Sequence, residues 1–184
     1  WISPKTKWYK IAESANYTKY SCYALNAGYQ ATQLIETVNQ KLQDQTLTIP
    51  LFVVMSKDDE TISDGAILSF FNQQSHPDSR LLIYASDNYE HNDARIEIRK
   101  STYPNLKILN FSHTCLMISP ENPLLGRESR YTDFTHYPNG HLIQPKNLYS
   151  GAVTKENLKK YTISRLSYNP DFNHMLQQLD SFLK

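Results

Sequence analysis

The sequence predicts an α/β protein with a mostly parallel sheet and flanking helices. Residues 49–55 form an apolar run without alternation, which is typical of a parallel strand covered on both faces. Residues 80–85 and 106–111 predict two further strands, and helical patterns follow the first and the last of the three. The order strand, helix, strand, strand and helix indicates half of a mostly parallel sheet.

The helices have their own signals. Apolar residues at spacings of three and four predict an amphipathic helix over residues 31–42. A second helix is predicted to start at Ser63-Asp64, where serine is a favourable N-cap, and to end before Pro77. Asn169-Pro170 predicts the start of a closing helix. That helix carries the apolar stripe Phe172, Met175, Leu176, Leu179 and Leu183.

Two connecting segments are predicted to be irregular. Residues 86–104 read as a polar excursion between strands, and residues 119–151 are interrupted repeatedly by proline and glycine.

Composition excludes some classes of function. Lysine and arginine total 19 against 18 aspartate and glutamate in 184 residues, so charge favours neither nucleic acid nor an anionic membrane surface as a partner. The longest apolar run is the length of one strand, far too short to span a membrane. Cys22 and Cys115 neither require nor exclude a disulfide, and they show no metal-binding spacing. We expect no cofactor. Because the chain begins at Trp1, we expect any upstream signal to have been removed, and the sequence indicates no compartment.

Two predicted strands run directly into loops that carry reactive side chains. Asp58, Asp59 and Glu60 follow strand 49–55, and His113 follows strand 106–111. A carboxylate that orients an imidazole is two thirds of a Ser-His-Asp triad, and acid before histidine is the chain order of α/β-hydrolases. Taken singly, the acids are also compatible with a solvated turn, and His113 with a structural or surface histidine.

The motif around the acids resembles the acid-bearing strand and turn of α/β-hydrolases. In that family the segment commonly reads as an apolar strand, then Gly-x-x-Asp-x-x-Val, then Pro or Ser. Aligning residues 50–63 with this pattern implies that Asp59 is the triad acid and Asp58 its exposed neighbour. Residues 111–113 are similar to the histidine loop, and residues 26–30 resemble the lid-to-core junction of some lipase- or esterase-like members. Ser56 and Ser112 depart from the pattern, because each stands where glycine is usual.

The resemblance covers roughly residues 20–125 and the closing helix. It implies a serine hydrolase acting on carboxylic esters such as acylglycerols or small acyl esters, in which Asp59 orients His113 and His113 acts as general base and then general acid. The alternative is a non-catalytic hydrolase-like binding module.

The nucleophile is the missing element. No Gly-x-Ser-x-Gly elbow occurs in the sequence. Ser14, Ser21 and Cys22 do not follow a predicted strand, and Cys115 is only two residues from His113. We therefore expect residues 1–184 to be a single partial domain, the C-terminal half of a hydrolase fold whose serine lies outside this chain. Residues 1–30 would be a lid or cap segment and residues 31–184 the core half.

A half sheet of this kind would expose an apolar edge. The expected partner is the missing N-terminal half of the same fold or a second copy of the chain.

Two sequence features are compatible with a metal site but have simpler explanations. His136 and His141, with Asp133 nearby, lie in sequence rich in proline and glycine, which favours a surface loop over a metal site. Magnesium at residues 58–60 lacks an accompanying phosphate-binding glycine loop. No metal is predicted.

Overall fold

The computed structural model describes residues 8–10, 23–74, 76–128, 135–136 and 148–184. The chain divides into two compact units, Trp1–Thr46 and Leu47–Lys184, and each is described by itself. The boundary expected after residue 30 lies within the first helix of the structure.

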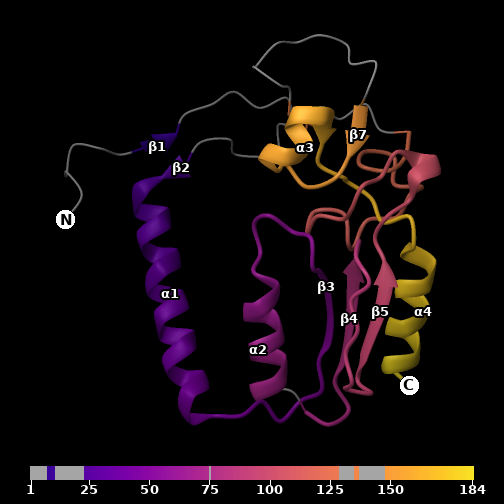
Figure 1. Ribbon diagram of the computed structural model, residues 1–184. Coiled ribbons are helices and arrows are strands. Elements are labelled where there is room, and N and C mark those ends of the chain that lie inside the picture. The colour runs from indigo at the N-terminus through magenta and orange to yellow at the C-terminus, as the bar shows by residue number, and fades with distance from the viewer. Residues whose placement is uncertain (1–7, 11–22, 75, 129–134, 137–147) are drawn as a thin grey trace. The chain divides into compact units, whose positions relative to one another are not determined.

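The first unit contains a pair of short antiparallel strands and one long helix (Figure 1). Strand β1 (Trp8–Lys10) pairs antiparallel with β2 (Tyr23–Ala24), and helix α1 (Leu25–Asp44) follows directly. Helix α1 includes the predicted helix 31–42 and extends it at both ends.

The second unit is built on a parallel sheet, which confirms the predicted α/β class. Its strands are β3 (Phe52–Ser56), β4 (Arg80–Ala85) and β5 (Ile96–Lys100), in the order β3-β4-β5. Both strand pairs are parallel. Helix α2 (Asp64–Gln74) connects β3 to β4, and the Ser63 hydroxyl accepts the Ala66 N–H at 3.3 Å, as expected of an N-cap.

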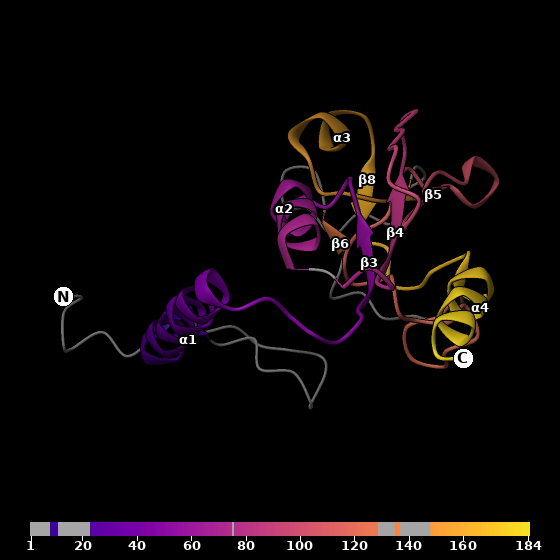
Figure 2. The same cartoon turned by 90° about the horizontal axis from the view of Figure 1, so that it is seen from below.

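One helix covers each face of this sheet. Because side chains alternate along a strand, Leu81 and Ile83 of β4 pack with Phe71 of α2 on one face. Leu82 and Tyr84 of the same strand pack on the other face, in the cluster that contains Met175 of α4 (Phe172–Phe182). Figures 1 and 2 show α2 and α4 on opposite sides of the sheet.

A second small sheet follows in the sequence. It has the order β6-β8-β7, where β6 is Thr135–His136, β7 is Leu148–Ser150 and β8 is Thr162–Ser164. Strand β8 is parallel to β7 and antiparallel to β6. Helix α3 (Lys155–Lys160) lies between β7 and β8 in the sequence, and the Thr154 hydroxyl accepts the Asn157 N–H at 3.1 Å at its start. Neither β8 nor α3 was expected from the sequence.

The predicted strand over residues 106–111 is wrong. A 3₁₀ helix, η1, occupies Pro104–Leu106, and Lys107 follows it with a left-handed φ of 53°. That conformation interrupts an extended chain, so Ile108 forms only isolated bridges, with Tyr103 and with Ser150. His113 therefore follows a loop held by single bridges rather than a regular strand.

The predicted irregular segment 86–104 contains the edge strand β5. Ile96 and Ile98 pack against the cluster beneath α2, whereas Glu97 and Arg99 pair with residues at the other face. Glu97 contacts His174 of α4, and Arg99 contacts Asp171 just before that helix. The Ile-Glu-Ile-Arg alternation is the signal that would have identified this strand.

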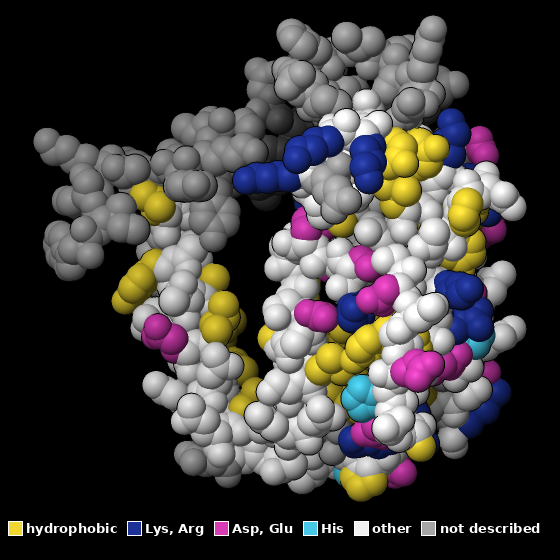
Figure 3. Space-filling model, viewed as in Figure 1, with side chains coloured by type: hydrophobic (Ala, Val, Ile, Leu, Met, Phe, Trp, Pro, Cys, Tyr) yellow, Lys and Arg dark blue, Asp and Glu magenta, His cyan; other side chains and the backbone are white. Residues whose placement is uncertain are grey.

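The surface carries both signs of charge. Basic and acidic side chains are interspersed on the face of the second unit shown in Figure 3. Among the helices that the structure describes, none is long and apolar enough to cross a membrane.

Candidate acid–histidine site

The Asp59 carboxylate lies buried in the turn that leaves β3. Its side chain is only 1% exposed. Its Oδ1 atom accepts the backbone N–H groups of Thr61 and Ile62, both at 2.7 Å. The Ile62 side chain is 43% exposed. The turn is thus fixed by its backbone contacts to Asp59 and not by the burial of Ile62.

The structure brings His113 to this carboxylate from 54 residues away. His113 Nδ1 lies 2.8 Å from Asp59 Oδ2, and the His113 backbone N–H also donates to the same oxygen. An ionised carboxylate can only accept, so Nδ1 carries a proton in this contact. The His113 side chain is 33% exposed, and its Nε2 makes no hydrogen bond to another described residue. The ring therefore has one nitrogen bound to the acid and one available to a proton donor.

The environment of Asp59 favours its charged form. Burial raises the pKa of the carboxyl, but the backbone N–H groups of Ile62, His113 and Thr61 and the His113 ring outweigh burial and hold the pKa below its ordinary value of 3.8. Asp59 is therefore ionised at neutral pH. A buried anion aligned on an imidazole is the arrangement that stabilises an imidazolium.

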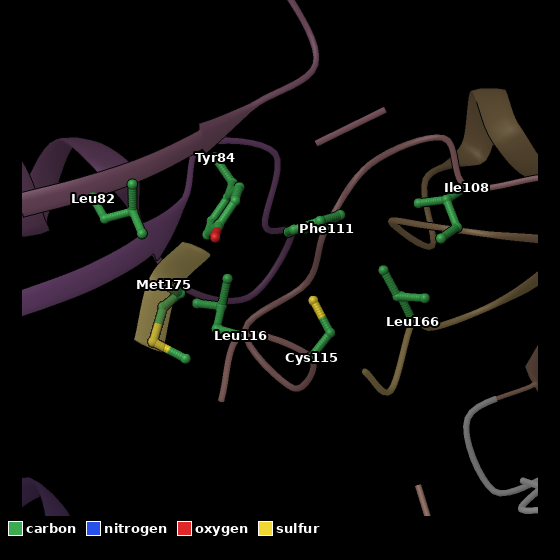
Figure 4. Packing of buried hydrophobic residues seen from close by; sticks show 8 residues of the cluster. All are labelled: Leu82, Tyr84, Ile108, Phe111, Cys115, Leu116, Leu166 and Met175. Atoms are coloured by element: carbon green, nitrogen blue, oxygen red, sulfur yellow. The ribbon is translucent and has the colours of Figure 1, made fainter. Parts of the chain in front are cut away.

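The residues beside His113 are part of the hydrophobic core. Phe111 and Cys115 are fully buried, and Figure 4 shows both within the cluster that also contains Tyr84 and Leu166. The Phe111 ring lies 4.8 Å from that of Tyr84, centroid to centroid. Because its neighbours are packed in this way, the histidine loop is fixed although it has no regular secondary structure.

Asp58 is not the exposed neighbour that the resemblance implied. It is partly buried, and its Oδ2 accepts the Ser86 N–H at 2.9 Å and the Ser101 hydroxyl at 2.8 Å. Its Oδ1 accepts the Ser86 hydroxyl at 2.6 Å. Ser86 follows β4 and Ser101 follows β5, so Asp58 joins the carboxyl ends of all three parallel strands. It makes no contact with His113 and serves to hold the sheet edge together.

Glu60 makes a further link from the acid turn. Arg165, just after β8, donates to Glu60 Oε1 from Nε at 2.9 Å and also from Nη2. The three consecutive acids therefore have three different partners. This division of roles argues against a simple solvated turn.

Cys115 is unsuited to act as the nucleophile. Its thiol is completely buried and donates to the Ser112 carbonyl oxygen at 3.0 Å. Burial raises the pKa of this thiol to about 12, so the reactive thiolate is scarce at neutral pH. Ser14, Ser21 and Cys22 lie outside the described residues.

Metal ligation finds no support in the part of the chain that the structure describes. No group of three or more histidine, cysteine, aspartate or glutamate side chains there could hold a metal ion. Asp133, His141 and the side chain of His136 lie outside that part of the chain.

The fold and the site together define an α/β protein with a buried carboxylate and a half-exposed histidine at the carboxyl edge of its parallel sheet. Comparisons with protein-family profiles, with curated proteins and with solved structures gave no match. The chemistry of the site is therefore inferred from its geometry and its sequence motifs.

Proposed function

We propose that this chain supplies the acid and the histidine of an α/β-hydrolase-type serine hydrolase that acts on carboxylic esters. The observation that carries the proposal is the 2.8 Å contact between His113 Nδ1 and the buried Asp59 carboxylate. It leaves Nε2 as the basic nitrogen, on a ring that remains one third exposed.

In the proposed reaction, Nε2 of His113 takes the proton of a serine hydroxyl as its oxygen attacks the ester carbonyl carbon. The imidazolium then gives this proton to the departing alcohol, which leaves an acyl-serine ester. Water attacks that ester with the same nitrogen as base, releasing the carboxylic acid and restoring the serine. Throughout, Asp59 stays ionised, keeps the proton on Nδ1 and stabilises the transient positive charge on the ring.

The serine and the oxyanion-binding N–H groups are proposed to lie outside this chain. Strand β3 stands at one end of the order β3-β4-β5, so its second edge has no neighbour among the described strands. That edge offers unpaired backbone groups to a further strand, from a nucleophile-bearing half or from a second copy. The acid turn leaves this same strand, so a strand added here would end close to Asp59.

A second candidate function is a hydrolase-like binding module without turnover. The specific observation in its favour is that no described hydroxyl or thiol contacts Nε2 of His113. The two candidates differ in whether a reactive serine accompanies this chain.

Intact mass spectrometry of the purified protein, with and without a fluorophosphonate ester probe, separates them. The enzyme proposal predicts a species heavier than the 21.4 kDa of this chain that gains the mass of the probe. A single unlabelled species of 21.4 kDa, without ester turnover, would support the binding module instead.

A further inference from the structure

The Asp59–His113 pair, called the dyad below, is not held in place by the histidine loop alone. His113 lies in a turn between residues 110 and 118 that contains no helix or strand. A site of this kind works only if its geometry is held to a fraction of an ångström. Ser56 and Ser112, the two serines at positions where the hydrolase pattern has glycine, are 4% and 0% exposed.

The Ser56 hydroxyl joins the acid turn to the histidine loop. It donates to the Phe111 carbonyl oxygen at 3.0 Å, two residues before His113. It also accepts the Asp58 N–H at 3.2 Å, one residue before Asp59. Glycine at this position could make neither contact. A single side chain at the end of β3 therefore sets the separation of the two segments that carry the dyad.

The Ser112 hydroxyl anchors the other side of the loop. It lies 3.0 Å from the Leu166 carbonyl oxygen, and the Thr114 hydroxyl lies 2.9 Å from that same oxygen. The two hydroxyl oxygens are 2.7 Å apart, so their two protons serve two of these three contacts at a time. The residues on both sides of His113 are thus held to one carbonyl just after β8.

The two anchors are connected through the chain. Arg165 directly precedes Leu166 in the chain and pairs with Glu60 of the acid turn. The acid turn is therefore held to the histidine loop directly through Ser56, and indirectly through Arg165 and the Leu166 carbonyl.

We propose that Ser56 and Ser112 are positioning residues whose hydroxyls hold His113 in register with Asp59. The structural half of this inference concerns the dyad itself, and its catalytic consequence rests on the proposed function. In this chain the two departures from the hydrolase pattern supply the contacts that keep a loop without regular secondary structure in place.

The test compares Ser56→Ala and Ser112→Ala with Ser79→Ala in the intact protein. Ser79 is a matched control because it is also buried, and its hydroxyl accepts the Leu51 N–H at 2.9 Å at the amino ends of β3 and β4, away from the acid turn. The first readout is the NMR signal of the His113 Nδ1 proton and its rate of exchange with water. The second is ester turnover, with kcat and KM measured separately.

We expect Ser56→Ala and Ser112→Ala each to speed this exchange about tenfold and to lower kcat about tenfold, with KM unchanged. Tenfold corresponds to about 1.4 kcal/mol, the scale of one hydrogen bond. Ser79→Ala should change neither quantity. Ser56→Thr keeps the hydroxyl and should recover most of the exchange protection. If Ser56→Ala does not fold, Ser112→Ala tests the same claim from the other side of the loop.

The outcomes separate this inference from the proposed function. If the protein has no ester turnover but the proton exchange responds to Ser56→Ala and not to Ser79→Ala, the positioning role stands and the enzyme proposal fails. If the protein hydrolyses esters but the Ser56→Ala, Ser112→Ala and Ser79→Ala variants behave alike in both readouts, the positioning role is overturned.

Discussion

Replacing Asp59 with asparagine perturbs the dyad with almost no change in shape. In the native turn, Oδ1 accepts two backbone N–H groups and Oδ2 accepts the His113 N–H and the Nδ1 proton. An asparagine oxygen would stay with the two N–H groups of Thr61 and Ile62. Its NH₂ group would then take the place of Oδ2 and face two donors.

The size of the expected loss in kcat follows from this clash between hydrogen-bond donors. The NH₂ group can satisfy the His113 ring only if the ring proton moves from Nδ1 to Nε2, which removes the base. We therefore expect Asp59→Asn to lower kcat by about 10⁴-fold, the loss typical when a triad histidine is held in the wrong tautomer. The His113 backbone N–H also loses its acceptor in a buried turn, so the free energy of unfolding should fall by about 1–3 kcal/mol.

The assay is the initial rate of hydrolysis of a p-nitrophenyl ester by the intact protein, with Asp58→Asn as the matched control. An asparagine at position 58 can keep all three contacts, because its oxygen can accept from Ser86 and Ser101 while its NH₂ donates to the Ser86 hydroxyl. Asp58→Asn should therefore have far less effect on turnover. Equal losses from the two variants, or no loss from either, would refute the assignment of Asp59.

Three further predictions concern the Asp59 carboxyl, the Cys115 thiol and the Phe111 ring. The pKa of Asp59 is lower in the folded protein, so its ionised form stabilises the fold above the ordinary pKa of 3.8, and this contribution is lost as the pH falls through the lower folded value. The difference in unfolding free energy between wild type and Asp59→Asn, from urea titrations, should thus shrink as the pH is lowered from neutral to below 3.8; a difference independent of pH would contradict it. Iodoacetamide should alkylate Cys115 only after unfolding in urea, because the thiol is buried and its pKa is raised to about 12; rapid alkylation of Cys115 itself in the folded protein, located by peptide mass mapping, would show that the loop opens. Phe111→Ala should lower the unfolding free energy by about 3–5 kcal/mol, since the ring is fully buried between Tyr84 and Tyr103; a loss below about 1 kcal/mol would show that the loop is not part of the core.

Strands β3 and β4 could be predicted because their sequences are mostly apolar, as expected of buried strands. Strand β4 matches the predicted residues 80–85, whereas β3 begins three residues after the start of the predicted run 49–55 and ends one residue beyond it. Helix α2 begins where Ser63 indicated. Asp59 could be singled out from three adjacent acids because its spacing matches the acid turn of hydrolases, and the structure places it, not Asp58 or Glu60, against His113.

The surroundings of His113 could not be predicted in the same way. The run 106–111 has the composition of a strand, but the left-handed conformation of Lys107 is set by the 3₁₀ helix before it and leaves no sign in hydrophobicity. Strand β5 does carry a local signal in its Ile-Glu-Ile-Arg alternation, but the partners of Glu97 and Arg99 lie more than 70 residues away in sequence. Contacts of that range are invisible to local patterns. The same reason explains why Ser56 and Ser112 read only as departures from glycine.

The measurement that tests the central claim most directly compares His113→Gln with His174→Gln in ester hydrolysis by the intact protein. His174 is a matched control because it is also a partly exposed histidine paired with a carboxylate, Glu97, at 2.7 Å, on the helix α4. We predict that His113→Gln abolishes measurable turnover and that His174→Gln leaves it unchanged. Turnover that survives His113→Gln, or that falls equally in both variants, would contradict a catalytic role for the Asp59–His113 pair.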